Sequence, residues 1–151
     1  MSDQLIIYKQ YFDNYKKYHK NNYNVLVHIL CIPSIVWSTF GIVNILEKKY
    51  KTPSITLYLL YMLYYYYFAP TKIFWKTFFF YLYILVHSNY HSYHLKKYIF
   101  IKSTGWFLQI LSHMYIEKNK PAFYTDLFGS FVTAPIFVVQ EISDFIKETY
   151  F

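Results

Sequence analysis

Six histidines lie in or beside strongly apolar segments of this 151-residue chain. Tyr15 with His19, and Asn24 with His28, form two pairs whose members are four residues apart. Residues at this spacing share one face of an α-helix. Ionisable side chains are costly in apolar segments and indicate function. His19 and His28 are therefore candidate metal ligands, although Tyr15 and Asn24 are by themselves also typical of interfacial and capping positions.

His19 and His28 can meet only if the chain breaks between them. On one straight helix, nine residues at ~3.6 per turn would place them about 180° apart. The polar sequence 20–22, Lys-Asn-Asn, favours a break at this point. In that arrangement His19 would end one helix and His28 would lie in the first turns of the next.

The second half of the chain adds His113, Glu117 four residues later, and Glu141 at the far end of the last apolar segment. If the helices bring these ends to one membrane face, three imidazoles and one or two carboxylates would meet. Such a ligand set suits Fe(II), Zn(II) or Mn(II), and an open coordination position would permit chemistry. The simpler alternatives are that Glu117 balances nearby lysines and that Glu141 is solvated.

His87, His91 and His94 have a spacing similar to the histidine boxes of membrane di-iron desaturases and hydroxylases. Those enzymes need several more boxes than this chain contains. Serine, asparagine and lysine residues surround the three histidines, which favours a polar helix face where a helix leaves the membrane.

Long apolar segments must position these residues, and they predict an all-α integral membrane bundle. Hydrophobic residues make up 56% of the chain. Residues 25–46 contain no Asp, Glu or Lys, and this length crosses a hydrocarbon core of ~30 Å at ~1.5 Å per residue. We expect four to five helices in a single membrane domain over residues 1–151, with an interfacial helix first. The segments are 5–18 (interfacial), 25–46, 54–69, 73–86, 106–116 and 122–139.

The charged residues favour a membrane surface over nucleic acid as a partner. All 15 basic residues are lysines, and 8 acidic residues leave a net charge of +7. Without arginine there is no planar fork for phosphates or guanines, and the lysines lie between apolar segments, where lipid headgroups are expected. Three glycines exclude a glycine-rich phosphate loop, and the single Cys31 excludes an intrachain disulfide and a Cys-rich zinc site. Twenty tyrosines with no arginine also indicate an AT-biased coding sequence.

Two groups of residues resemble a family of small endoplasmic-reticulum membrane proteins. The family is typified by a yeast 2-hydroxy fatty acid (2-hydroxypalmitate) dioxygenase that acts in the metabolism of phytosphingosine to odd-numbered fatty acids. The matching residues are Tyr18 to His28 with Ile32-Pro33, then Pro70-Thr71, Gly105-Trp106-Phe107-Leu108-Gln109, His113, Glu117, Pro121-Ala122, Leu127, Ala134-Pro135-Ile136-Phe137 and Glu141. Ser112 and Asp126 differ from the Gly and Asn that the family usually has there.

The resemblance implies a multi-pass protein of the endoplasmic-reticulum membrane that catalyses an Fe(II)-dependent α-oxidation. A long-chain 2-hydroxy fatty acid and O2 would give a fatty acid one carbon shorter. The implied metal ligands are His19, His28 and His113, and either Glu117 or Glu141 would be a further ligand or would orient one. Tyr15 and Asn24 would hold these ligands in place, and the acyl tail would lie among aromatic helices.

The residues alone are also compatible with two other classes of protein. A non-catalytic membrane protein, such as an assembly factor or a small transporter, would use the same polar groups for interhelical hydrogen bonds. A membrane zinc hydrolase would use similar ligands without needing O2. The sequence leaves the oligomeric state and the membrane orientation open.

Overall fold

The computed structural model describes residues 3–50, 54–91, 93–119 and 127–150, and this part of the chain is helical and contains no strand. This confirms the predicted all-α fold class. The elements are α1 (Asp3–Lys17), α2 (Asn22–Tyr50), α3 (Ser54–Phe68), α4 (Thr71–Tyr90), α5 (Leu95–Leu111), the π-helix η1 (Ser112–Glu117) and α6 (Leu127–Tyr150).

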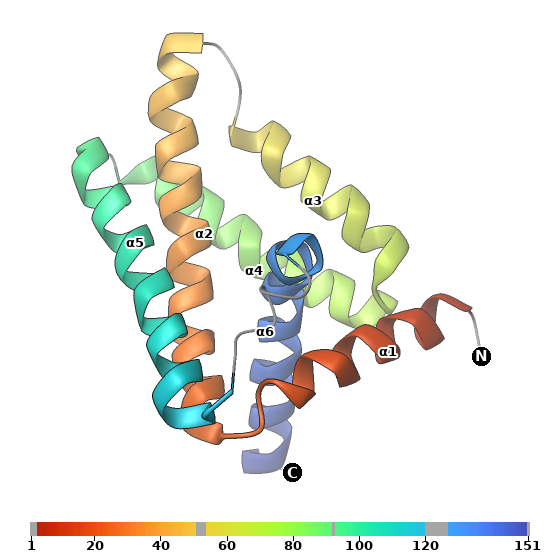
Figure 1. The fold of residues 1–151 in the computed structure, drawn as a ribbon. Coiled ribbons are helices and arrows are strands. Elements are labelled where there is room, and N and C mark those ends of the chain that lie inside the picture. Colours follow the sequence, from red (N-terminus) through yellow and green to blue (C-terminus); the bar gives the residue numbers. More distant parts are fainter. Residues whose placement is uncertain (1–2, 51–53, 92, 120–126, 151) are drawn as a thin grey trace.

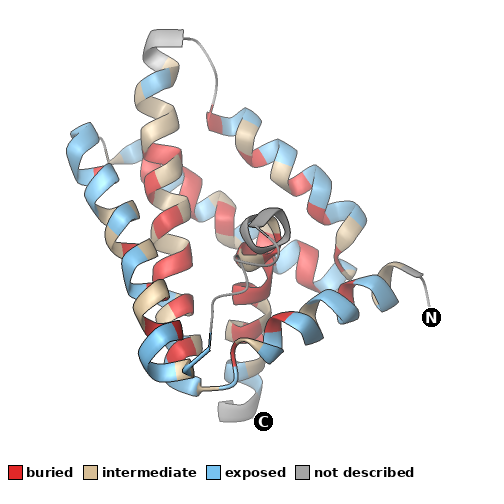
Figure 2. Cartoon of the chain, viewed as in Figure 1, coloured by how far each residue is buried: buried red, intermediate tan, exposed pale blue. Residues whose placement is uncertain are grey.

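Helix α2 is the central element of the fold. It packs along α5 and also contacts α4 and α6, while α3 and α4 form an adjacent pair (Figure 1). Helix α1 crosses the same end of the molecule at which α2 begins and η1 ends. Buried residues line the inner faces of these helices, and outer faces are mostly exposed (Figure 2). The end of the bundle where α1, α2 and η1 meet therefore brings together the three chain segments that carry the candidate ligands.

The helix boundaries agree with most of the predicted apolar segments and correct two details. Helix α1 ends at Lys17 and α2 begins at Asn22, which confirms a break between His19 and His28. Helix α5 begins at Leu95 and not near residue 106, so it includes the lysine-rich residues that were expected to precede the apolar segment 106–116. The expected segment 122–139 lies partly outside the described residues, and α6 extends beyond it to Tyr150.

Buried tyrosines contribute polar links inside the apolar core. The hydroxyl of Tyr58 donates to the carbonyl of Phe78 at 2.9 Å, and that of Tyr65 donates to the carbonyl of Val132 at 2.7 Å. Tyr81 bonds in the same way to Pro135 at 3.0 Å. A buried hydroxyl without a partner would be costly, so these bonds allow the large rings to be buried fully. They tie α3 to α4, and both helices to α6.

Among the described residues, one helical stretch, Asn22–Glu47, is long and apolar enough to cross a membrane. It contains the predicted segment 25–46. Many large apolar side chains on the other helices are exposed, including Leu60, Tyr67, Phe79 and Phe100. A multi-pass arrangement of these helices stays a prediction.

Helix α2 approaches α5 closely at Gly41, and this contact gives a test of the packing. A Cβ at Gly41 would lie 2.1 Å from the ring of Tyr98, which is fully buried and donates its hydroxyl to the carbonyl of His91. Gly41→Ala should lower the free energy of unfolding by about 1–3 kcal/mol, because the overpacking outweighs the ~1 kcal/mol gain in helix propensity. Denaturant unfolding in detergent measures this change.

Gly105→Ala is the matched control. The added Cβ would meet atoms of the Ile35 side chain at 2.8 and 3.2 Å, which is a smaller overlap than the one at Gly41. We expect a smaller loss than for Gly41→Ala. An equal or larger loss for Gly105→Ala would contradict the packing described at Tyr98.

Candidate metal centre

Three histidines from separate chain segments lie together at the α1, α2 and η1 end. One ring nitrogen of each of His19, His28 and His113 lies within 4.8 Å of the corresponding nitrogens of the other two. The ring centroids are 4.4 to 4.9 Å apart, and the planes are close to perpendicular. All three side chains are buried. Three buried imidazoles with nitrogens this close together form a candidate metal-ligand set.

Two of the rings are oriented by main-chain carbonyls one helical turn earlier. His19 Nδ1 lies 2.8 Å from the carbonyl oxygen of Tyr15, and His28 Nδ1 lies 2.9 Å from that of Asn24. A carbonyl only accepts, so each Nδ1 carries the proton and each Nε2 keeps a lone pair for a metal. Tyr15 and Asn24 thus act on the rings through their backbone, and the Tyr15 ring also stacks on His19 at a centroid distance of 3.9 Å.

Two ring nitrogens of this histidine triad (His19, His28 and His113) lack the hydrogen-bond partners that buried polar atoms usually have. His19 Nε2 and His113 Nδ1 are buried and have no hydrogen-bond partner among the described residues. Burial, followed by the neighbouring His28, lowers the pKa of His19 to about 2, so this imidazole is neutral at physiological pH. Neutral imidazoles with free lone pairs are the form that binds metal. The residues present therefore fit a divalent transition metal such as Fe(II), Zn(II) or Mn(II).

His113 lies in the π-helix η1, which continues α5. Such wide turns are rare and are frequently found at functional sites. The element ends at Glu117 and is followed by Lys118, which has a left-handed backbone (φ 55°, ψ 33°). The N–H groups of Lys118 and Asn119 both donate to the His113 carbonyl. The main chain at His113 is thereby fixed beside the start of α2. Spacing of polar residues in the sequence does not reveal the π-helix.

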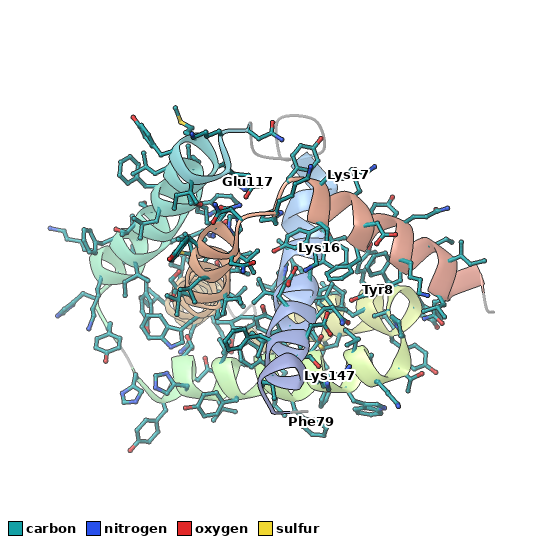
Figure 3. The ribbon with its side chains drawn as sticks, turned by 90° about the horizontal axis from the view of Figure 1, so that it is seen from below. Tyr8, Lys16, Lys17, Phe79, Glu117 and Lys147 are labelled. Carbon is teal, nitrogen blue, oxygen red and sulfur yellow. The ribbon has the colours of Figure 1, made fainter. Side chains whose placement is uncertain are left out.

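Glu117 holds the break between α1 and α2 in place. Its two carboxylate oxygens accept the backbone N–H of Lys20 at 2.9 Å and of Asn21 at 3.0 Å, and the Asn24 side-chain amide at 3.1 Å. A carboxylate is also favoured beside the N-terminus of a helix, here that of α2. Figure 3 labels Glu117 beside this connection. Its predicted role at the metal stays a prediction, since the structure gives its oxygens other partners.

Ser112 stands where the family that this sequence resembles usually has glycine. Its hydroxyl joins the hydrogen-bond network of Glu117 and Asn24. It donates to Asn24 Oδ1 at 2.6 Å, while Asn24 also donates to the Tyr18 carbonyl at 3.4 Å. Ser112 therefore contacts the side chain of Asn24, whose backbone carbonyl orients His28. The sequence alone did not reveal this contact. The other differing position, Asp126, lies outside the described residues.

Glu141 lies on α6 and pairs with Lys16 of α1. Its oxygens are 2.7 and 2.8 Å from Lys16 Nζ, and the Glu141 side chain is buried. Lys16 is labelled beside α6 in Figure 3. This ion pair fastens the helix that precedes His19 to α6. The two residues are 125 positions apart, so no sequence spacing could have paired them. The role of Glu141 in catalysis stays a prediction.

The three other histidines do not form a stripe on one helix. Helix α4 ends at Tyr90, His91 is its C-terminal flanking residue, and His94 flanks the start of α5. His87 Nδ1 accepts the indole N–H of Trp37 at 3.0 Å. Because α4 ends before His91 and α5 begins after His94, the three histidines do not share the face of one helix, which supports the interpretation as polar residues at helix ends.

The network at Glu117 predicts a loss of stability for Glu117→Gln. The amide keeps one acceptor oxygen but turns an NH2 group toward N–H donors, so the free energy of unfolding should fall by roughly 2 kcal/mol. Glu47→Gln is the matched control, because Glu47 accepts one backbone N–H, from Ser54, at the α2 to α3 connection. We expect a loss below about 1 kcal/mol there. Equal losses of unfolding free energy for the two variants, measured by chemical denaturation, would show that the network at Glu117 stabilises the fold no more than the single hydrogen bond at Glu47.

Comparison with known proteins gives the family of this chain. A family model described as "Mpo1-like: 2-hydroxy-palmitic acid dioxygenase Mpo1-like" matches residues 7–146. A Saccharomyces cerevisiae protein named 2-hydroxy-palmitic acid dioxygenase MPO1 is 27% identical over 144 residues, which cover 93% of this chain and 82% of the yeast protein. No solved structure matches. Because the family model spans the fold from α1 to α6 and includes all three histidines, the chain belongs to the Mpo1-like family.

Proposed function

We propose that this protein is an Fe(II)-dependent dioxygenase that shortens 2-hydroxy long-chain fatty acids by one carbon. The observation that carries the proposal is the buried histidine triad, whose nitrogens lie within 4.8 Å of one another. The family description and the name of the yeast relative support the substrate class and the use of O2. We extend the proposal to the role that the family resemblance implies, the degradation of phytosphingosine to odd-numbered fatty acids.

The proposed reaction balances without an external reductant. A 2-hydroxy acid and O2 give the acid one carbon shorter, CO2 and water. The bond between C1 and C2 breaks, the two carbons together lose four electrons, and O2 accepts them. A bound Fe(II) would supply the one-electron chemistry through which O2 reacts with such a substrate, which Zn(II) does not supply.

The chain's own contribution is a rigid, dry and neutral ligand set. His19, His28 and His113 would hold the metal, and the carbonyls of Tyr15 and Asn24 fix two of the rings in the required tautomer. Burial keeps water away from the three rings. Three protein ligands leave coordination positions for a chelating substrate and for O2.

The proposed location is the endoplasmic-reticulum membrane, with the lipid bilayer as a partner. Helix α2 carries a stretch that could cross a bilayer, and exposed apolar and aromatic side chains cover the outer faces of other helices. Contiguous exposed apolar surface is uncommon on soluble proteins and is typical of membrane contact. A long-chain acid partitions into the same phase, so it would reach the site from the lipid.

Metal binding tests the ligand assignment. His19→Ala, His28→Ala and His113→Ala should each lower Fe(II) affinity by more than the ~10- to 100-fold seen when a residue that only orients a ligand is lost. Anaerobic Fe(II) titration of detergent-purified protein measures this. His91→Ala, at the end of α4, is the matched control and should bind Fe(II) as the native chain does. Unchanged iron content in both His28→Ala and His113→Ala would contradict the assignment.

Turnover tests the reaction itself. Fe(II)-loaded protein given 2-hydroxypalmitate and air should release a fatty acid one carbon shorter, detected by mass spectrometry, with consumption of O2. Palmitate, which lacks the 2-hydroxyl, should remain unchanged. Hydrolysis of a substrate by the zinc-loaded protein without O2 would support the hydrolase class, and absence of any metal binding would support the non-catalytic class.

A further inference from the structure

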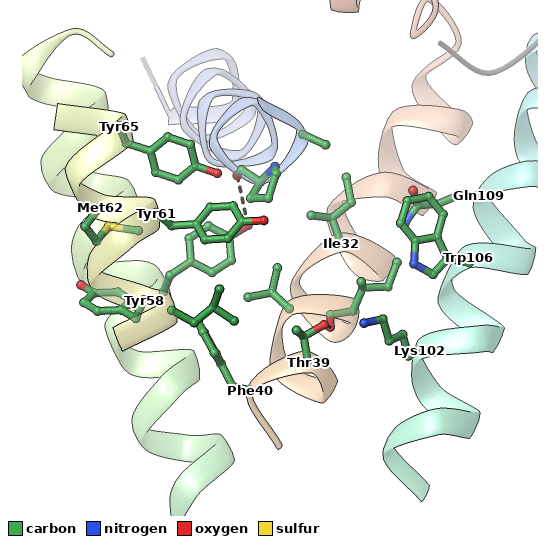
Figure 4. A pocket seen from close by; sticks show the side chains of 16 residues that line it. Ile32, Thr39, Phe40, Tyr58, Tyr61, Met62, Tyr65, Lys102, Trp106 and Gln109 are labelled. Carbon is green, nitrogen blue, oxygen red and sulfur yellow. Dashed lines mark hydrogen bonds between the residues drawn. The ribbon is translucent and has the colours of Figure 1, made fainter. Parts of the chain in front are cut away.

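A cavity of about 230 Å³ lies between α2, α3, α4, α5 and α6. Figure 4 shows Tyr58, Tyr61 and Tyr65 on one side of it and residues of α5 on the other. Its lining is largely apolar and aromatic, with Gln109 and Lys102 as polar members from α5. The volume lies just below the ~300–1,000 Å³ typical of small-molecule pockets. It can accommodate part of a long-chain molecule.

The cavity begins one helical turn from the histidine triad on two different helices. Ile32 follows His28 by four residues on α2, and Gln109 precedes His113 by four residues on α5. Both Ile32 and Gln109 line the cavity. Residues four apart lie on the same helix face, so the faces that carry the two ligands continue directly into the cavity wall.

Gln109 is a buried polar residue whose amide nitrogen is unused. Its side chain is only 6% exposed, and Nε2 has no hydrogen-bond partner among the described residues. A buried donor left unpaired is costly and rare in native structures. An unpaired N–H donor that lines a cavity beside the triad therefore indicates a bound acceptor, and an acid's oxygen atoms are acceptors.

We propose that this cavity holds the acyl chain of the substrate and that Gln109 Nε2 donates a hydrogen bond to an oxygen of its 2-hydroxy acid head. The placement of the head beside the triad rests on the proposed function. The apolar wall then contacts the methylene groups, and Gln109 is a binding residue that fixes which end of the molecule faces the histidines.

The opposite orientation of the acid is the physical alternative. Lys102 lies seven residues before Gln109 on α5, about 10 Å farther along the helix at ~1.5 Å per residue. Its ammonium group would also attract a carboxylate. The position of Gln109 one helical turn before His113, where the proposed reaction needs the acid head, favours the head at Gln109.

The first experiment detects occupancy without turnover. Trp106 lines the cavity, whereas Trp37 and Trp75 do not. In metal-free W37F/W75F protein, a palmitate brominated in mid-chain should quench Trp106 fluorescence saturably, and excess 2-hydroxypalmitate should reverse the quenching. A W37F/W106F protein, which retains Trp75, is the control and should show no saturable, reversible quenching. Absence of saturable quenching at Trp106 would overturn the acyl site.

The second experiment tests Gln109 against Lys102. In the W37F/W75F protein, Gln109→Met keeps the length of the side chain but removes the donor, and it should lower the affinity for 2-hydroxypalmitate about tenfold while leaving Fe(II) affinity unchanged. Gln109→Glu should lower it further, because two carboxylates would face each other. Lys102→Met should change it less than twofold. Loss of affinity in Lys102→Met with none in the Gln109 variants would overturn the proposed orientation.

The outcomes separate this inference from the proposed function. If the Gln109 variants form the shortened acid with the native KM, the role of Gln109 fails and the dioxygenase assignment stands. If binding depends on Gln109 but no shortened acid forms in the Fe(II)-loaded native protein, the acyl site stands and the proposed reaction fails.

Discussion

The carboxylate of Glu117 fixes the break between α1 and α2, and the histidine triad depends on that break. Without it, His19 and His28 would point to opposite sides of one helix. The break exposes backbone N–H groups at Lys20 and Asn21, and Glu117 accepts both of them together with the Asn24 amide. One side chain on η1 thereby positions the chain on both sides of the gap. Because η1 also carries His113, the same contact places the third imidazole beside the other two.

The sequence was sufficient to predict the helical class, the break and the three histidines that meet there. Periodicity, apolar length and the polar residues 20–22 suffice for the helical class and the break, because these depend on local residues and on hydrophobicity. The meeting of the three histidines was conditional on the arrangement of the helices, and the family resemblance implied it. The sequence could not supply the pairing of Lys16 with Glu141, or the π-helix at His113, because these depend on tertiary packing. The four-residue spacing of Tyr15 and Asn24 from the histidines was informative for their backbone carbonyls, and for Tyr15 also for the ring that stacks on His19. At that spacing any residue of a helix presents its carbonyl to the ring.

Tyrosines show why composition alone misjudges an apolar core. Their abundance indicates codon bias, yet Tyr58, Tyr65, Tyr81 and Tyr98 are among the most buried side chains, and each donates its hydroxyl to a main-chain carbonyl. A phenylalanine would fill the same volume and leave the bond unmade. These tyrosines add directional links between helices whose packing is otherwise non-directional. Such links limit sliding of α3 and α4 along α6, and three of these tyrosines, Tyr58, Tyr65 and Tyr81, also line the cavity.

The charge balance of the triad constrains what it can bind. Its three imidazoles are neutral ligands, and Glu117 and Glu141, the carboxylates predicted for the site, have other partners. A divalent cation held by the triad would keep its full charge in a buried, weakly polar region, where charge is expensive unless it is paired. If Glu117 moved to the cation, two backbone N–H groups and an amide would lose their acceptor. A substrate that brings its own carboxylate balances the charge at no such cost, and a 2-hydroxy acid adds a second oxygen from the adjacent carbon. The ligand set therefore favours an anionic, chelating substrate over a neutral lipid.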